Sequence, residues 1–552
     1  MLRRENSARP AMRDRLRDVE LTAAAVISAA AVWLHAEAAV SAGPLWRDEV
    51  NTVALVTPGT IRDVWNNLHF DSFPLLWPLL VRFYSRVFGE MNDPAFRVLG
   101  FFIGVSVIVA LWINARVFRY KAPLISLALF ALSPSVIRWG DSLRAYGLGI
   151  VAILCAVALI WRYIESPTVG RFIAATGVAL ISVHLLYYNA VLLFGFVVAA
   201  IVVCVHRRAW LQTRYVLLIG VIPAVTMLPY LAVNRSAKDW LPLVQIPSYT
   251  FGWFIAKLYE TLDPGGPWSL ALWLDSVALA LLIAASIILK RSNRTAPEAR
   301  YDKTLFAVVA LSVGVIGSGL FLRKLSFLTQ PWYYLTLLAC AALSTDILLG
   351  IGLRRKSARV AKLIAAVAVS AATFYVGRTA VTERLTSVDR VARTLGVSAT
   401  ASDLIVVTPW YYGVSFQRYY SGPTPWVTLP DMNFHRFHRF DIVKTAMQAS
   451  NQLDPIKPAI DSARATLTRG GRIFLVGEPR VPEDSEDVDL PGPAPTPSGR
   501  WPEPAYSIQW SLAFSQYIKR HSVRFRVLVP RSATPVSHYE NFVVLVAEGW
   551  RP

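Results

Sequence analysis

The sequence predicts a polytopic α-helical membrane protein with an α/β domain at the C-terminal end of the chain. Of the 552 residues, 54% are hydrophobic and 17% are charged, and the mean hydropathy is +0.42. A soluble protein carries about 25% charged residues. The hydrophobic residues also form runs of about 17–25 residues, the length that crosses a bilayer. Residues 378–552 have a different character, with short strand-like and helical patterns instead of such runs.

The chain starts with an arginine-rich segment, residues 1–19, followed by a run long enough to span a membrane. We see no small-residue cleavage site, so we expect an uncleaved anchor with a cytoplasmic N-terminus. Residues 20–377 form the predicted transmembrane domain. Its eleven expected spans lie near 20–41, 96–117, 122–138, 145–163, 171–187, 189–206, 214–233, 268–289, 304–322, 331–352 and 360–377.

The distribution of basic residues predicts the orientation. With the N-terminus inside, the inner segments hold 24 Lys and Arg residues, and the longer outer loops hold 12. This bias fits the positive-inside rule. An odd number of spans then places residues 378–552 outside the membrane. Because the basic residues cluster at span ends, the formal charge of +20 does not indicate a nucleic-acid partner. All three cysteines lie in apolar runs, so no disulfide framework is expected.

Residues 378–552 are expected to form a soluble α/β domain outside the membrane. Its acidic, Pro-rich segment 481–504 is predicted to be a disordered loop. Strand-like runs cover 403–408, 472–476, 525–529 and 542–547, and helical patterns cover 386–396 and 441–467.

An acidic pair, Asp48-Glu49, follows the first span, at the start of the outer loop 42–95. Two carboxylates at a membrane surface can act as a general base, a metal ligand or a hydrogen-bond acceptor. Taken alone, the pair is more simply a solvated loop feature neutralised by Arg47. The same outer loop is rich in aromatic residues and amphipathic, as expected of a segment that lies in the membrane interface and meets lipid-like ligands. It also holds His69 and Asp71, for which helix capping and catalysis are equally weighted.

A third polar cluster, Ser133 to Tyr146, follows the third span. Its Arg138 and Arg144 either anchor the interface or bind a phosphate through charge-assisted hydrogen bonds. In the outer loop 234–267, Lys257 is a weaker candidate for the same role.

In this order, the segments resemble the GT-C membrane glycosyltransferases, in particular the group of protein O-mannosyltransferases and lipid A aminoarabinose transferases. The features are the acidic pair, the His/Asp-x-x-Pro segment with its aromatics, and the Ser-Pro…Arg-x-Tyr segment that opens the fourth span. Phe96-Arg97-Val98-Leu99 is similar to the family's entry into the second span. The resemblance covers residues 20–200 well, the later spans loosely and the C-terminal domain in general plan.

Two departures from the family pattern stand out. Phe73-Pro74-Leu75 occupies the place where many relatives have Pro-Pro-Leu, and Gln330 to Tyr334 lacks the Arg-Tyr that many carry near the tenth span. The second departure weakens a phosphate-binding role there, and Arg323 and Lys324 are the nearby substitutes.

The resemblance implies transfer of a sugar from a polyprenyl-phosphate donor to a glycolipid, glycan or protein acceptor at the outer face of a bacterial inner membrane. One base suffices because a phosphate leaving group needs little protonation. Asp48 would be that base, giving inversion, and Glu49 would orient the acceptor or assist a cation; no cofactor is certain, and a divalent metal stays open. The expected substrate-binding residues are His69, Asp71, Arg138, Arg144, Tyr146 and Lys257.

Other classes are weighed against this one. A transporter, flippase or polymerase/ligase for lipid-linked glycans would carry ionisable residues in mid-span, where they are costly, and the predicted spans hold few. A scaffold that recruits envelope enzymes is the third alternative. His435 and His438 have zinc-like spacing but fit better an exposed basic-aromatic helix or loop. Gly314 to Gly319 fits helix packing, and no nucleotide-binding fingerprint occurs in a strand–turn–helix context.

Overall fold

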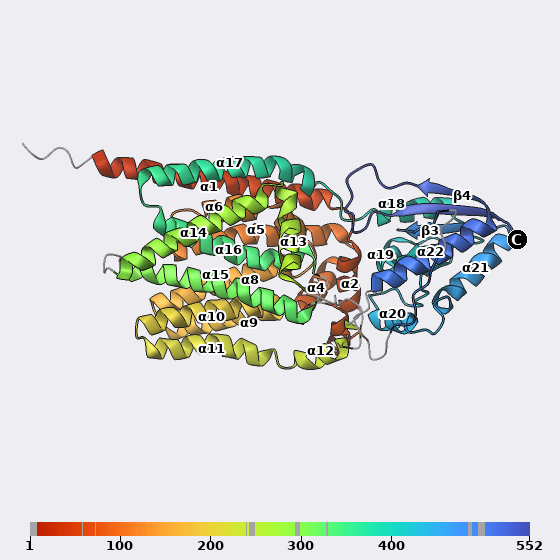
Figure 1. The fold of residues 1–552 in the computed structure, drawn as a ribbon, viewed down its shortest axis with the longest axis horizontal. Coiled ribbons are helices and arrows are strands. Elements are labelled where there is room, and N and C mark those ends of the chain that lie inside the picture. Colours follow the sequence, from red (N-terminus) through yellow and green to blue (C-terminus); the bar gives the residue numbers. More distant parts are fainter. Residues whose placement is uncertain are drawn as a thin grey trace, which may run out of the picture.

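The computed structural model describes residues 8–57, 59–71, 73–238, 240–241, 249–292, 298–326, 329–483, 488–494 and 503–552. It consists of a bundle of long helices and a smaller domain with a β-sheet, which caps one end of the bundle (Figure 1). The short helices α2, α4 and α12 lie at the end of the bundle that faces this domain. The predicted fold class, a polytopic helical membrane protein with a C-terminal α/β domain, is therefore confirmed.

Among the described residues, eight helices are long and apolar enough to cross a membrane. Each coincides with one of the eleven predicted spans. Their large exposed side chains, such as Phe102, Phe194 and Leu282, face outward from the bundle, where lipid would lie. The helices are α1 (Ala8–Ser41), α5 (Asp93–Val117), α8 (Tyr146–Glu165), α10 (Tyr188–His206), α14 (Ser269–Ser292), α15 (Glu298–Leu325), α16 (Leu335–Gly352) and α17 (Lys356–Val381).

The other three predicted spans are irregular. The run near 171–187 is α9 (Val169–Leu185), which is shorter than the eight. The run near 214–233 is a bent pair, α11 (Trp210–Thr226) and α12 (Tyr230–Ala237), with 48° between the two helices. Pro223 lies inside α11, and Pro229 lies at the bend, directly before α12. Proline disrupts the hydrogen-bond ladder of a helix.

The prediction of one continuous span at 122–138 is wrong. The segment forms α6 (Leu124–Ser126), a π-helical turn η2 (Leu127–Ala131) and α7 (Pro134–Gly140). The chain is extended at Ser133, because the residue before a proline avoids the helical region. The break makes α7 a separate helix, and Arg138 and Trp139 lie on it.

Small residues allow two of the long helices to pack closely. A Cβ added to Gly195 on α10 would lie 3.3 Å from the backbone nitrogen of Gly314 on α15. Gly314 therefore serves helix packing, in agreement with the interpretation drawn from the sequence.

The ends of the spans next to the C-terminal domain carry short helices that line the junction with it. In α4, Trp77 and Val81 are buried while Phe83 and Phe88 are exposed, which is the arrangement of an interfacial amphipathic helix. These short elements are α2 (Arg47–Val56), α3 (Ile61–Asn67), η1 (Leu68–Phe70), α4 (Leu76–Phe88), α13 (Phe251–Leu262), η4 (Asp263–Gly265) and η5 (Pro331–Tyr334).

The C-terminal domain contains a five-stranded mixed sheet in the order β2-β1-β3-β5-β4. Strand β1 pairs in parallel with β2 and β3, and β5 pairs antiparallel with β3 and β4. The strands are β1 (Leu404–Thr408), β2 (Trp426–Thr428), β3 (Ile473–Gly477), β4 (Ser522–Val529) and β5 (Val543–Trp550), and the helices are α18 (Val388–Ser398), α19 (Tyr412–Tyr419), α20 (Phe440–Met447), η6 (Asp454–Ile456), α21 (Lys457–Thr468) and α22 (Glu503–His521).

Four of these strands match the predicted runs, and β2 was not expected because it has only three residues between two prolines. The predicted helix at 441–467 is two helices, α20 and α21, since Asp454-Pro455 begins a 3₁₀ turn between them. Of the predicted loop 481–504, residues 484–487 and 495–502 lie outside the described residues, and α22 already begins at Glu503.

Direct hydrogen bonds join the two parts. Asp93, at the start of α5, accepts hydrogen bonds from Arg418 Nη2 at 2.6 Å and from the Tyr419 hydroxyl at 2.5 Å. The backbone N–H of Leu385 donates to the Ala42 carbonyl at 2.9 Å. The C-terminal domain is thus held against the end of the bundle that carries α2.

Candidate active site

Asp48 is the second residue of α2, and its position follows from how that helix begins. The chain is extended at Trp46, and the Trp46 N–H donates to Glu49 Oε2 at 3.1 Å, which caps the helix. Asp48 then points away from the core and keeps 23% of its side-chain surface exposed. Within the part of the chain that the structure describes, its carboxylate has one recorded partner, Arg47 Nε at 3.6 Å. This distance leaves the oxygens of Asp48 available to a substrate.

Glu49 has a different environment from its neighbour. It is fully buried, and its Oε1 accepts hydrogen bonds from Arg97 Nη1 at 2.6 Å and from the Leu143 N–H at 2.7 Å. Its Oε2 accepts from Arg97 Nη2 at 2.8 Å and from Trp46 N. Both oxygens are therefore saturated, since a carboxylate has about four lone-pair sites. The geometry supports a structural role for Glu49 and leaves it no free position for an acceptor or a cation.

Arg47 links the acidic pair to the C-terminal domain. Its guanidinium lies 4.5 Å from the ring centre of Tyr411, and its Nη1 donates to the Tyr539 carbonyl at 2.8 Å. The backbone N–H of Arg47 donates to the buried carboxyl of Glu540 at 3.2 Å. Burial disfavours the charged form of Arg47, but Tyr411, Asp48 and the other neighbours raise its pKa on balance, so it remains a cation.

Arg144, Asp71 and Thr52 form a buried network beside Asp48. Arg144 Nη1 lies 3.1 Å from Asp71 Oδ1, and it donates to Thr52 Oγ1 at 2.7 Å and to the Asp48 carbonyl at 2.9 Å. Thr52 in turn donates to Asp71 Oδ2 at 2.9 Å. Three of the residues singled out from the sequence, Asp48, Asp71 and Arg144, are thus brought together although 96 positions separate the first from the last.

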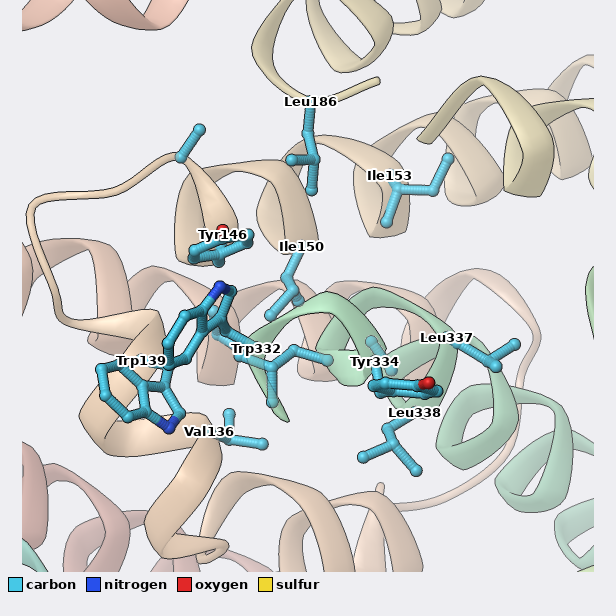
Figure 2. Close-up of a cluster of buried hydrophobic side chains, with 14 of the residues drawn as sticks. Val136, Trp139, Tyr146, Ile150, Ile153, Leu186, Trp332, Tyr334, Leu337 and Leu338 are labelled. Atoms are coloured by element: carbon cyan, nitrogen blue, oxygen red, sulfur yellow. The ribbon is translucent and has the colours of Figure 1, made fainter. Parts of the chain in front are cut away.

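Aromatic side chains form the wall beneath this network. The Phe73 ring lies 4.4 Å from the Arg144 guanidinium and 5.3 Å from the Tyr146 ring. Tyr146 opens α8 and is buried against Trp332 and Tyr333 of η5. Figure 2 shows Tyr146, Trp332 and Trp139 next to one another, beside the apolar side chains Ile150 and Ile153 of α8 and Leu337 and Leu338 of α16. The contacts of Tyr146 with Phe73, Trp332 and Tyr333 give it a packing role.

Two other predicted residues, Arg138 and Lys257, lie apart from this network. Arg138 pairs with Glu383, and both line a cavity of about 270 Å³ between α7, η4, α17 and the C-terminal domain. Lys257 Nζ lies 2.5 Å from Glu260 Oε2, and Glu260 lines the same cavity. The structure therefore groups these side chains around a second space, whose wall includes Tyr539.

His69 is half-buried in η1, and its ring lies 3.9 Å from that of Phe70. Phe70 in turn contacts Phe437 of the C-terminal domain at 5.5 Å between ring centres. The structure therefore places His69 beside the domain junction.

The C-terminal domain contributes side chains to the site that the sequence did not suggest. His438, expected to be exposed, is 8% exposed, and its backbone N–H donates to Asn51 Oδ1 on α2 at 2.8 Å. Glu540 is fully buried, and burial raises its pKa to about 7. The exposed-loop interpretation of His438 is wrong because the segment is covered by α2 and by the rings of Trp410 and Phe440. No local pattern marks such residues, since their partners lie hundreds of positions away.

The described residues contain no group of three or more His, Cys, Asp or Glu side chains placed to hold a metal ion. His435 and His438 face different surroundings: the His435 ring packs 4.3 Å from that of Trp426, and His438 faces α2. We therefore assign no metal ligands.

No protein-family model and no curated protein matches the sequence. Among solved structures, ArnT from Cupriavidus metallidurans bound to undecaprenyl phosphate is similar at a TM-score of 0.50 and 11% identity, over 82% of this chain and 92% of that chain. The oligosaccharyltransferase of Archaeoglobus fulgidus in the apo form gives a TM-score of 0.47 and 12% identity, over 83% of this chain and 69% of that one. ArnT in the apo state gives 0.48 and 12%, over 82% and 92%.

The likeness to the first of these structures is a likeness of fold. It confirms that the chain has the GT-C fold expected from the sequence resemblance, with a multi-pass membrane bundle followed by an extramembrane domain. At the junction of the bundle and the C-terminal domain, Asp48 keeps 23% of its side-chain surface exposed.

Proposed function

We propose that the protein is a membrane glycosyltransferase that moves a sugar from a polyprenyl-phosphate donor to a hydroxyl group of an acceptor at the outer membrane face. The observation that carries this proposal is the contrast between the two neighbouring acids. The nearest cation to Asp48 is Arg47, whose Nε lies 3.6 Å away, whereas Glu49 is paired with Arg97 at 2.6 Å and Asp71 with Arg144 at 3.1 Å. A single available base beside a bilayer is the minimum that such a transfer needs.

In the proposed reaction, Asp48 takes the proton of the acceptor hydroxyl as its oxygen attacks the anomeric carbon of the donor sugar. The bond between that carbon and the phosphate oxygen breaks, and the polyprenyl phosphate leaves with the electron pair. The configuration at the anomeric carbon is inverted because attack and departure occur on opposite faces. A phosphate leaves as a stable anion, so no general acid is required, in contrast to the acid and base of a glycosidase.

Arg144 is the residue that we assign to the donor phosphate. Its guanidinium is fixed at the residue that carries the base, because Nη1 donates to the backbone carbonyl of Asp48 at 2.9 Å. Asp71 and Asp48 raise the pKa of Arg144 against the effect of its burial, so it stays charged where phosphate charge develops. Arg138 and Lys257 are held by Glu383 and Glu260 around the separate cavity, which makes them weaker candidates.

The lipid carrier is supported by the structural relative. The ArnT structure holds undecaprenyl phosphate, and the present chain shares that fold over most of its length. The exposed side of the amphipathic α4, with Phe83 and Phe88, provides apolar surface for an isoprenoid chain. We propose a bacterial inner-membrane location with the N-terminus in the cytoplasm and the C-terminal domain outside.

A transporter is the rival from another class, and the buried ionisable groups argue against it. Asp346 on α16 accepts hydrogen bonds from Ile125 N and Ser126 N, which caps α6. Asp302 pairs with Arg207 at 2.9 Å. These acids hold helices together and do not line a path across the bundle.

The test is to delete the gene and to compare envelope glycolipids, glycans and glycoproteins by mass spectrometry. The proposal expects one class of product to disappear, to return with the wild-type protein and to stay absent with Asp48→Asn. Full recovery with Asp48→Asn would overturn the role of the base, and an unchanged set of products in the deletion strain would overturn the function.

A further inference from the structure

His438 belongs to the C-terminal domain and lies against α2, the helix that carries Asp48. It belongs to the segment between β2 and α20. Its backbone N–H is fixed by Asn51, which follows Asp48 by three residues and therefore lies on the same side of the helix. The ring is held between Trp410 and Phe440, with ring centres 5.8 and 5.9 Å away.

The two nitrogens of the His438 ring have different environments. One ring N–H donates to the Tyr411 carbonyl, and Nε2 is buried without a partner among the described residues. The donating nitrogen is therefore Nδ1, which leaves Nε2 with an unshared lone pair. A buried polar atom without a partner is unfavourable, so it marks a position that a ligand can satisfy.

The charges around the ring determine what kind of ligand group fits. Asp48, Arg47 and Arg144 are all close enough to interact electrostatically with His438, yet burial lowers its pKa to about 4, so the ring is neutral near pH 7. A neutral nitrogen with a lone pair accepts a hydrogen bond and cannot donate one. It would therefore bind a hydroxyl group and repel the oxygens of a phosphate.

On the basis of the proposed function, we propose that His438 Nε2 binds a second hydroxyl of the acceptor, adjacent to the one that reacts at Asp48. The reacting hydroxyl has one proton, and that proton passes to Asp48. The lone pair of His438 Nε2 therefore requires a second O–H group as its hydrogen-bond donor. His438 gains no proton and forms only the hydrogen bond that orients the acceptor.

This arrangement defines the class of acceptor. Neighbouring hydroxyls occur on a sugar ring, whereas the side chain of a serine or threonine offers only one. The acceptor is therefore a glycan or the sugar headgroup of a glycolipid.

The test uses the deletion strain complemented with the full-length protein and its variants, and it measures the missing envelope product by mass spectrometry. His438→Asn keeps a side-chain N–H near the Tyr411 carbonyl and removes the group at the Nε2 position. His438→Gln places an amide oxygen near that position. We expect His438→Asn to lower the product by about tenfold, as loss of one well-placed hydrogen bond does, and His438→Gln to stay within about threefold of the wild type.

His438→Phe is the second variant without Nε2, and it retains the ring that packs between Trp410 and Phe440. It should show the same loss as His438→Asn at wild-type membrane abundance and with an unchanged elution profile in detergent. Full product with either variant, or equal losses with Asn and Gln, would overturn the role of Nε2.

The outcomes separate this inference from the proposed function. Loss of product with Asp48→Asn but not with His438→Asn and His438→Phe overturns the inference alone. Full product with Asp48→Asn overturns the catalytic proposal itself. The linkage position, read from the same mass spectra, must be a sugar carbon with a hydroxyl on an adjacent carbon, and a product on a serine or threonine side chain would overturn the acceptor class.

Discussion

Arg97 holds Glu49 with both terminal nitrogens of its guanidinium, at 2.6 and 2.8 Å, and the carboxylate of Glu49 is fully buried. This ion pair joins the first turn of α2 to α5. The Leu143 N–H, which also donates to Glu49, joins the segment before α8 to the same turn. One acid of the Asp48-Glu49 pair is therefore a structural anchor. Its neighbour is held at the surface by that anchor and is free to react.

Arg97→Ala should destabilise the protein strongly, because it leaves the Glu49 carboxylate buried without its counter-ion. Breaking a buried ion pair in this way costs about 3–5 kcal/mol. The midpoint of thermal unfolding in detergent measures it. The control is Arg378→Ala, which removes a 60% exposed side chain 3.6 Å from Glu37 and should cost less than about 1 kcal/mol. Equal shifts for the two variants would contradict the anchoring role.

Asp48→Asn should lower the rate of sugar transfer by about 10²–10⁴-fold, the usual contribution of a general base. The unfolding midpoint should stay unchanged, because the Asp48 carboxylate supports no hydrogen bond within the described structure. The rate is measured in membranes from the complemented strain. Asp63→Asn is the matched control, since Asp63 is an exposed acid that caps α3 in the same outer loop. A similar loss of rate in this control would contradict a specific role for Asp48.

Arg144→Lys should weaken the binding of undecaprenyl phosphate by about tenfold or more. Lysine keeps the charge that faces Asp71 but lacks the planar fork that binds a phosphate with two hydrogen bonds. Binding to the purified protein is measured with undecaprenyl phosphate as the probe. The control is Arg138→Lys at the separate cavity. If both variants bind the probe equally, Arg144 has no special role at the phosphate.

The stability of the protein should depend on Glu540 between about pH 4.5 and pH 7. Burial raises the pKa of this carboxyl from 4.5 to about 7, so the folded protein retains a proton that the unfolded chain releases. Its stabilising contribution is complete below pH 4.5 and is lost as the pH rises through 7, a change of about 3 kcal/mol.

Glu540→Gln removes this titration. The difference in unfolding midpoint between the variant and the wild type should therefore shift in favour of the variant as the pH rises from 5 to 8. Glu90→Gln, at an exposed position, should show a constant difference over the same range. A constant difference for Glu540→Gln would mean that this carboxyl titrates normally.

A reporter fused after Pro552 tests the orientation. Alkaline phosphatase, which is active only outside the cytoplasm, should be active in this fusion, and green fluorescent protein exported through the same route should be dark. The opposite pattern would place the C-terminal domain inside and would contradict the positive-inside assignment. A fusion after Arg207, in a predicted inner segment, is the control with the reversed expectation.

Much of the fold follows from local sequence properties. Eight spans and four strands lie where hydrophobic runs predicted them, because run length and alternation are local consequences of burial in lipid or in a sheet. The segment at 122–138 failed because its composition is apolar while Pro134 breaks the backbone. The count of apolar residues reports how hydrophobic a segment is, but it does not report where its helix breaks.

The sequence by itself determined that this is a multi-pass membrane protein and that two acids stand together after its first span. Only the tertiary structure decided that Glu49 is an anchor and Asp48 is available, and that His438 lies against α2. The reason is distance along the chain. Glu49 is fixed by groups 48 and 94 positions away, and His438 meets Asn51 across 387. Hydrogen bonds between such remote groups have no local pattern, and they arise only when the bundle and the C-terminal domain pack against each other.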